Sequence, residues 1–204
     1  MKLKFCGLST LNSLKHACDL GAHYAGFIFA DRSPRKVNQE FMDQLASFNF
    51  HQTIPVCVFV NPSAVFVEQV IASLPTAILQ FHGDESDQFC SQFNKPFWKS
   101  VAVKDASSLP LISSNRHPSA QAILLETFSV NLDGGTGQTF DWDIIKDINL
   151  SNGYVLAGGI NAANIDAAIS LNPWCIDINS GVESQLGLKD TLLMTEIMQR
   201  FNHG

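Results

Sequence analysis

The sequence predicts an α/β protein: one domain over residues 1–204, in which eight strand and helix units close into a (β/α)8 barrel. Short apolar runs alternate with amphipathic segments along the whole chain, and no linker divides them. The alternation repeats about every 20 to 30 residues, which indicates parallel strands joined by crossovers. With 204 residues, 46% of them hydrophobic, the chain is long enough for one sizeable core.

The expected strands are short apolar runs bounded by turn-forming residues. They lie at residues 2–6, 25–29, 54–60, 77–81, 97–101, 122–126, 154–157 and 175–178. The helix-like segments between them often follow a side chain that can cap a helix. The expected caps are Asn38, Ser63, Ser86, Asp141, Asn161 and Asp190, with Asn161 ahead of a helix over residues 162–170. An open, doubly wound sheet is the alternative, although no G-x-G-x-x-G follows the first strand.

Composition and charge exclude several classes of protein. The net charge is −6 with only 13 Lys and Arg, which argues against a nucleic-acid partner because a phosphate backbone requires a basic surface. No apolar run reaches the roughly 18 residues of a membrane span, and Met1 leads straight into a strand-like segment. We therefore expect no membrane association and a cytoplasmic location. The five cysteines are scattered without a C-x-x-C pair, which favours reduced thiols over disulfides or a metal site.

Polar residues follow the expected strands at the points where those strands end. The carboxyl ends of barrel strands meet at one mouth, where active sites of this fold lie. A packed core does not easily explain a thiol, a histidine, a lysine and carboxylates converging there. The sequence therefore predicts a site formed by residues that include Cys6, Arg35, Asn61, His82, Asp84, Lys99, Glu126 and Asp177.

Two glycine turns near the end of the chain predict an anion site. Gly158 and Gly159 follow the seventh strand, and Ser180 and Gly181 follow the eighth. Backbone N–H groups at such turns can hold a phosphate without a basic side chain. The alternative is that both are ordinary turns. A third glycine-rich segment, over residues 133–140, suggests a lid, or a surface turn instead.

Six motifs follow one another across nearly the whole chain: "KFCGLS", "GFIFADRSPRKV", "LQFHGDE", "GGTGQTFDW", "LAGGIN" and "DINSGVE". In their order and spacing they resemble the phosphoribosylanthranilate isomerase family. The resemblance implies a (β/α)8 barrel, no cofactor, and a phosphorylated sugar–anthranilate as small-molecule substrate. The implied reaction is the Amadori rearrangement of N-(5-phosphoribosyl)anthranilate to 1-(2-carboxyphenylamino)-1-deoxyribulose 5-phosphate, the third step of tryptophan synthesis from chorismate.

The resemblance assigns the general base to Cys6. An ordinary thiol has a pKa near 8.5, so positive charge or N–H groups nearby would have to favour its anion. A purely structural role as a buried, unreactive thiol is the better interpretation for the other four cysteines, Cys18, Cys57, Cys90 and Cys175.

The resemblance assigns the general acid to position 126, where this chain departs from the family. The family's sixth strand usually ends in "LLDT", whereas this chain has Leu124, Leu125, Glu126 and Thr127. The extra methylene of glutamate moves the acidic oxygen by roughly 1 Å unless its rotamer compensates, and such a misplacement can cost about a hundredfold in rate.

The resemblance implies further substrate contacts, each with an ordinary structural alternative. Arg35 would pair with the anthranilate carboxylate, or would be a solvated loop residue. Asp177 would bind substrate hydroxyls, or would cap nearby N–H groups. Gln80 and His82 lie in "LQFHGDE", where a histidine is otherwise more often a core residue.

Three other functions stay open at this point. The histidine-pathway sugar isomerase performs the same chemistry, but the pattern of that family has an aspartate at the end of strand one and another at the end of strand five. This chain has Cys6 at the end of strand one. Phosphate-binding epimerases would need metal ligands that we do not find. A binding-only barrel, made catalytically weak by Glu126, is the alternative from another class. We expect a monomer, with a homodimer as the alternative.

Overall fold

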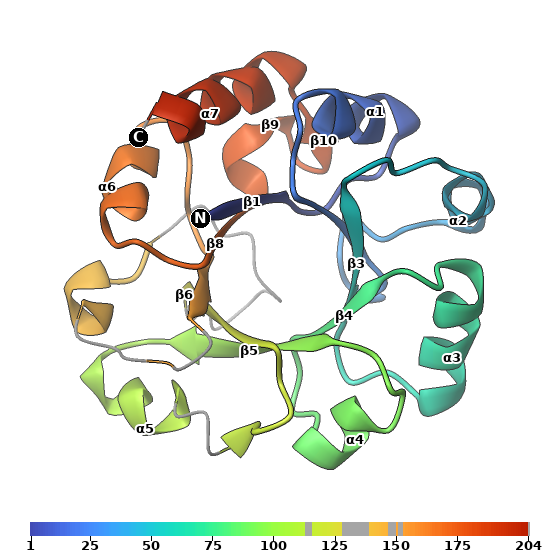
Figure 1. Cartoon of the computed structure of the whole chain (residues 1–204), viewed down its shortest axis with the longest axis horizontal. Coiled ribbons are helices and arrows are strands. Elements are labelled where there is room, and N and C mark those ends of the chain that lie inside the picture. Colours follow the sequence, from blue (N-terminus) through green and yellow to red (C-terminus); the bar gives the residue numbers. More distant parts are fainter. Residues whose placement is uncertain (113–115, 128–138, 147–149, 151–152, 204) are drawn as a thin grey trace.

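Eight parallel strands close into a barrel in the computed structural model, which describes residues 1–112, 116–127, 139–146, 150 and 153–203 (Figure 1). Each strand pairs with the next, and β1 pairs in parallel with β8, so that Lys4 lies opposite Asp177. The predicted (β/α)8 barrel is confirmed; that residues 1–204 form a single domain stays a prediction. The strands are β1 Lys2–Phe5, β2 Tyr24–Ile28, β3 Ile54–Phe59, β4 Ile78–Phe81, β5 Phe97–Val103, β6 Ala122–Thr127, β7 Tyr154–Leu156 and β8 Cys175–Ile178.

Helices surround the barrel, and polar side chains cap several of their first turns (Figure 1). The α-helices are α1 Leu11–Asp19, α2 Gln39–Ala46, α3 Ala64–Ser73, α4 Asp87–Ser91, α5 Leu109–Ile112, α6 Ile165–Ser170 and α7 Thr191–His203. Asn38, Ser63 and Ser86 accept the predicted capping bonds ahead of α2, α3 and α4. Asp190 Oδ1 accepts the N–H of Leu192 at 2.8 Å at the start of α7.

One prediction about a helix start and one about a helix type need correction. The helix expected over residues 162–170 begins at Ile165, because Asn161 Oδ1 accepts the N–H of Ala163 and holds a turn ahead of it. Asp141 does cap its segment, but that segment is the short 3-10 helix η3 Trp142–Ile145. The suggested lid over residues 133–140 lies mostly outside the described residues.

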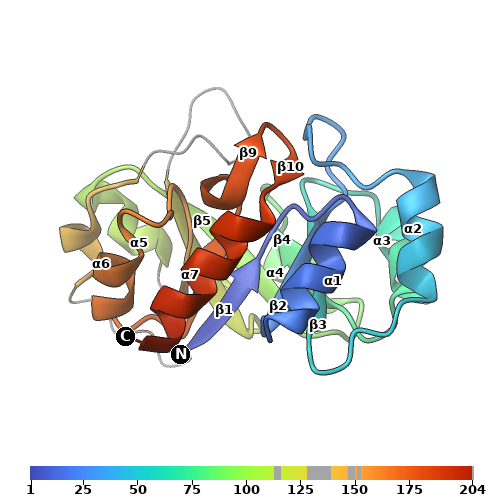
Figure 2. The same ribbon diagram turned by 90° about the horizontal axis from the view of Figure 1, so that it is seen from above.

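A short hairpin and two further 3-10 turns complete the described elements. The turns are η1 Ala106–Ser108 and η4 Ser180–Val182, and the hairpin pairs β9 Glu183–Gln185 with β10 Leu188–Lys189. Both termini lie at one end of the barrel, and the hairpin lies at the other end, where the strands finish (Figure 2). The hairpin therefore stands beside the predicted mouth.

Alternating side chains divide the core into an outer and an inner part. On β6, Ile123 and Leu125 belong to the apolar layer between barrel and helices, whereas Ala122 and Leu124 lie inside the barrel. Because successive strand residues point to opposite faces, Glu126 shares the inner face with Leu124. Tyr24, Trp98 and Leu124 help to fill the lower interior, with Tyr24 and Trp98 edge to face at 4.9 Å. The apolar filling leaves the polar layer above it facing the mouth.

A matched pair of leucine substitutions tests the inner core. Leu124 is fully buried, whereas Leu192 is 79% exposed. Leu124→Ala should lower the free energy of unfolding by about 2–5 kcal/mol, because it leaves a cavity inside the barrel. Leu192→Ala should change it by less than about 0.5 kcal/mol. Urea unfolding with an unchanged slope measures both, and equal losses would contradict the described interior.

Candidate active site

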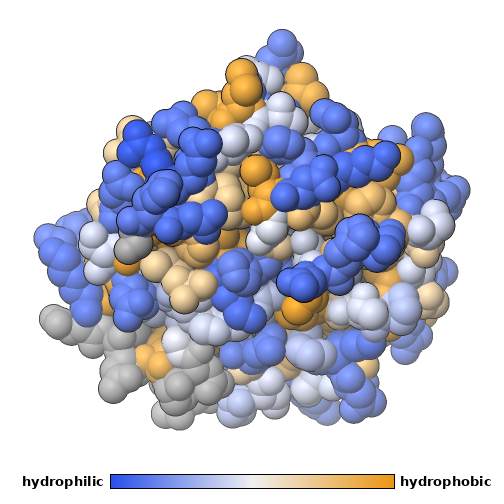
Figure 3. Space-filling model, turned by 45° about the horizontal axis from the view of Figure 1, so that its top comes forward, coloured by the Kyte–Doolittle hydropathy of each residue, from blue (hydrophilic) through white to orange (hydrophobic). Residues whose placement is uncertain are grey.

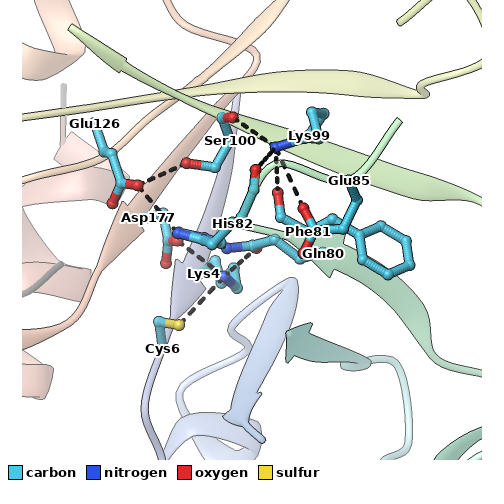
Figure 4. A network of polar contacts seen from close by, with 11 residues as sticks. Lys4, Cys6, Gln80, Phe81, His82, Glu85, Lys99, Ser100, Glu126 and Asp177 are labelled. Carbon is cyan, nitrogen blue, oxygen red and sulfur yellow. Dashed lines mark hydrogen bonds and ion pairs between the residues drawn. The ribbon is translucent and has the colours of Figure 1, made fainter. Parts of the chain in front are cut away.

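A cavity opens at the carboxyl end of the strands, where the sequence predicts the site. Five predicted side chains line it together with apolar groups such as Ile28 and Val58. The five are Cys6, Gln80, His82, Glu126 and Asp177. They come from β1, β4, β6 and β8 or from the residues just after those strands, so closure of the barrel brings them together (Figure 4).

A buried lysine connects three of these groups. Lys4 is fully buried on β1, and its ammonium group donates to Asp177 Oδ2 at 2.8 Å, to Gln80 Oε1 at 2.7 Å and to Cys6 Sγ at 3.3 Å (Figure 4). Burial by itself lowers the pKa of Lys4, but the charge of Asp177 and the contacts with Asp177 and Cys6 outweigh it, and the pKa is raised. Lys4 is therefore a fixed cation beneath the cavity.

The thiol of Cys6 is protonated in the free protein. Burial raises its pKa above a reference value of 9.0, and the carboxylate of Asp177 raises it further. Lys4 and Lys189 oppose these effects without overcoming them. The nearby positive charge that the chemistry requires is thus present, but it does not by itself produce a thiolate.

The surroundings of Glu126, in contrast, favour its ionised form. Burial opposes its ionisation, but His82, Ser100 and Lys99 outweigh burial and lower the pKa of the carboxyl below its ordinary 4.5. Its Oε1 accepts from Ser100 Oγ at 2.6 Å and lies 3.1 Å from His82 Nδ1. His82 Nε2 in turn contacts the side-chain amide of Gln80, which links this cluster to Lys4.

The two glycine turns lie against the same cavity. Gly158, Gly159 and Ser180 line it. Gly158 has φ +89°, and a Cβ there would lie 2.7 Å from the backbone nitrogen of Thr127. A Cβ at Gly181 would lie 1.8 Å from the carbonyl oxygen of Ile160, so the two turns pack directly on each other.

Arg35 is not among the residues that line the cavity, although its side chain and that of Asn179, which does line it, both lie close to Gly7. Its guanidinium pairs with both carboxylate oxygens of Glu183, at 2.6 and 2.8 Å, and is 4% exposed. Lys189 also contacts Glu183, at 2.7 Å. Burial opposes ionisation of Glu183, but these two cations outweigh it and lower its pKa to about 2. The pairing of Arg35 with a substrate carboxylate stays a prediction.

Sequence reasoning missed Lys4 and Ser100 and placed Lys99 at the mouth. Lys99 instead donates to the carbonyl oxygens of Gly83 and Phe81, at 2.6 and 3.3 Å, and holds the turn after β4. The period of two on β1 was an available signal, because it puts Lys4 on the same face as Cys6. Ser100 carried no comparable signal, since serine is common in many environments.

The described residues show neither a metal cluster nor a membrane-spanning helix. No group of three or more His, Cys, Asp or Glu side chains among them is placed to hold a metal ion. None of the helices described here has the length and apolar character needed to cross a membrane.

Comparison with known proteins identifies the family. The profile of the family described as N-(5'phosphoribosyl)anthranilate (PRA) isomerase matches residues 3–200. The chain belongs to this family. Among similar relatives, the N-(5'-phosphoribosyl)anthranilate isomerase of Legionella pneumophila (strain Paris) is 41% identical over 201 residues, covering 98% of this chain and 96% of the relative. That of Pelobacter propionicus is 38% identical over 205 residues, covering 98% and 94%.

Solved structures of the same family share the barrel. Phosphoribosyl anthranilate isomerase from Thermotoga maritima superposes with a TM-score of 0.88 at 26% identity, covering all of both chains. A complex of the enzyme with reduced 1-(o-carboxyphenylamino)-1-deoxyribulose 5-phosphate superposes with a TM-score of 0.85 at 25% identity, also over the full length of both. The chain is accordingly a PRA isomerase of tryptophan biosynthesis.

Alkylation of Cys6 tests its described environment. In a Cys18→Ser background, iodoacetamide labelling of the Cys6 peptide should rise with pH to a midpoint above 9.0, because burial and Asp177 disfavour the thiolate. Lys4→Met should move the midpoint higher, whereas Lys2→Met on the same strand should leave it unchanged. Mass spectrometry of variants that keep the wild-type far-UV circular dichroism measures the rates. A midpoint below 9.0 in the wild type would contradict the environment described.

Proposed function

We propose that Cys6 and Glu126 carry out the isomerisation as general base and general acid. The observation that supports this most is that both line one cavity, although Cys6 directly follows β1 and Glu126 lies on β6. A thiol and a carboxyl group can accept and donate a proton without a cofactor, and the family resemblance places these roles on Cys6 and Glu126 among the titratable groups of the cavity. The substrate we propose is N-(5-phosphoribosyl)anthranilate.

The proposed reaction has two proton transfers. Protonated Glu126 donates to the ring oxygen of the ribose, the bond from that oxygen to the anomeric carbon breaks, and the nitrogen lone pair forms an iminium ion. The Cys6 thiolate then removes the proton from the adjacent carbon, and the electron pair of that bond neutralises the iminium to give the enolamine. The enolamine corresponds to the enol form of the aminodeoxyribulose phosphate product.

The reactive protonation state is a minor one. The chemistry needs a thiolate and a carboxylic acid, whereas burial of Cys6 and the donors around Glu126 favour a thiol and a carboxylate. Moving one proton from Cys6 to Glu126 creates the reactive form without changing the total charge of the pair. Catalysis by such a form depends on the coupled titration of both groups.

The remaining cavity groups are proposed to bind the substrate. Asp177 Oδ1 is buried without a partner among the described residues, so a ribose hydroxyl could donate to it. The turns at Gly158, Gly159, Ser180 and Gly181 are proposed to hold the phosphate through backbone N–H groups. Gln80 and His82 would contact the sugar from the opposite wall.

Arg35 would need to change partner to take its proposed role. It is held by Glu183 through Nε and Nη2, so contact with the anthranilate carboxylate would have to use its remaining nitrogen or loosen this pair.

We also propose that the enzyme acts as a cytoplasmic monomer. On the face shown in Figure 3, apolar groups are scattered among hydrophilic ones, and a broad apolar contact surface is not seen in that view. Among the structural relatives, monomers of the dimeric enzyme from Thermotoga maritima superpose with a TM-score of 0.84 at 26% identity. A homodimer is the alternative, and light scattering at assay concentration distinguishes the two.

Turnover by the purified protein tests the acid and base assignments. Loss of anthranilate-adduct fluorescence should be slowed about 10²- to 10⁴-fold in Glu126→Gln and in Cys6→Ala, because each removes one proton transfer. Glu196→Gln, an exposed change on α7, should match the wild type. A Glu126→Gln enzyme with wild-type turnover would remove Glu126 from the mechanism. Substrate binding by the wild type without turnover would favour a binding-only barrel.

The pH profile tests the proposed protonation state. The pKa of Glu126 lies below 4.5 and that of Cys6 above 9.0. Between the two, each tenfold gain in thiolate is matched by a tenfold loss of protonated Glu126, so kcat/KM should be flat from about pH 5 to about pH 9. It should fall below the pKa of Glu126 and above that of Cys6. A narrow maximum near neutral pH would contradict this assignment.

A further inference from the structure

A buried serine lies directly beside the proposed acid. Ser100 is 7% exposed on β5, and its hydroxyl donates to Glu126 Oε1 at 2.6 Å (Figure 4). A hydrogen bond of this length to an ionised oxygen is a strong one. Neither the motifs nor the family comparison assigns any role to this residue.

The barrel register places the serine below the carboxyl. Ser100 follows Trp98 by two residues and so lies on the same inner face of β5. It is paired with Leu124, whereas Glu126 is paired with Ala102, one inner residue closer to the mouth. The glutamate must therefore reach back toward the serine. An aspartate at 126 would be shorter by one carbon–carbon bond, about 1.5 Å, and would fall short of this hydroxyl.

A glutamate needs more restraint than an aspartate because it has one more rotatable bond. Two groups provide that restraint at the same oxygen, Ser100 Oγ and His82 Nδ1. Within the described part of the chain, no hydrogen bond ends on Oε2. One carboxyl oxygen is thus fixed, and the other stays available at the cavity.

We infer that Ser100 is a positioning residue that fixes Glu126 through Oε1, so that Oε2 can deliver the proton to the substrate. This inference rests on the proposed role of Glu126 as general acid. It assigns to Ser100 the compensation for the extra methylene, which otherwise would misplace the acidic oxygen by roughly 1 Å.

The hydrogen bond also has a consequence that a purely structural serine would lack. Ser100 is one of the groups that lower the pKa of Glu126. Without its hydroxyl, the pKa of Glu126 rises, and the acid limb of the kcat/KM profile moves to higher pH.

A double-mutant cycle between positions 100 and 126 tests the inference. Ser100→Ala should lower kcat about 10- to 100-fold with KM changed less than about twofold, and should move the acid limb to higher pH. Ser100→Thr, which keeps a hydroxyl, should restore kcat to within about threefold of the wild type. In a Glu126→Asp background, Ser100→Ala should change kcat by less than about twofold, because the shorter carboxyl does not reach the serine.

A matched control separates this effect from lost stability. Ser13 is a buried serine on α1 whose hydroxyl donates to Thr10 O, and Ser13→Ala should leave kcat and the acid limb unchanged. Thermal melts should show that both alanine variants are folded at the assay temperature. If the Glu126→Asp enzyme turns over too slowly to complete the cycle, the pH of the acid limb in the kcat/KM profile of Ser100→Ala tests the inference instead.

Two outcomes would overturn the inference. One is wild-type kcat with an unmoved acid limb in Ser100→Ala. The other is an equal loss when Ser100→Ala is introduced into the wild type and into the Glu126→Asp enzyme. Failure of the underlying proposal looks different, because Glu126→Gln would then retain turnover. An inactive Glu126→Gln beside a fully active Ser100→Ala would remove only the role of Ser100.

Discussion

The site depends on one buried cation. Lys4 has no exposed surface, and its three donors are used on Asp177, Gln80 and Cys6. An unpaired ammonium in that position would be strongly unfavourable, so the carboxylate of Asp177 is what allows Lys4 to be charged there. Because these contacts reach from β1 to β4 and β8, they hold the three strands in register around the cavity.

This cation also connects the two ends of the proposed reaction. On one side it lies next to the Cys6 thiol, where it partly offsets the effect of burial and of Asp177 on the pKa. On the other side it holds Gln80, whose amide contacts His82, which in turn lies beside Glu126. The proposed base and the proposed acid are therefore supported by one connected polar layer, above an interior that Tyr24, Trp98 and others fill. A network of this kind is stable only when nearly all its members are satisfied.

The glutamate at position 126, where the family resemblance implied an aspartate, changes how the proposed acid is held. A longer arm reaches back into the polar layer and gains donors from β5 and from the end of β4, at the cost of an additional torsion angle to be fixed. The donors favour the ionised carboxyl, which opposes its proposed function as an acid. The same hydrogen bonds thus fix the Glu126 carboxyl in place and lower its pKa, so a well-positioned carboxyl group comes with a lower proton affinity.

The sequence by itself determined the architecture and the identity of the proposed reacting groups. Short apolar runs located all eight strands, local side-chain caps located the starts of α2, α3 and α4, and the strand-end motif located Cys6. These features are local, because each depends on residues a few positions apart. The start of α6 was misjudged for the same reason: Asn161 satisfies a nearby turn before the helix begins.

Tertiary structure alone decided how the groups are partnered. Lys4 contacts Gln80 and Asp177 across 76 and 173 residues of sequence, and Arg35 contacts Glu183 across 148. Such pairs follow from barrel closure and strand register, which fix distances that no local pattern contains. The same register sets Ser100 one inner position below Glu126. The residue types at the mouth could therefore be predicted from the sequence. Their protonation states, their neighbours and their freedom to move depend on closure of the barrel, in which β8 pairs with β1.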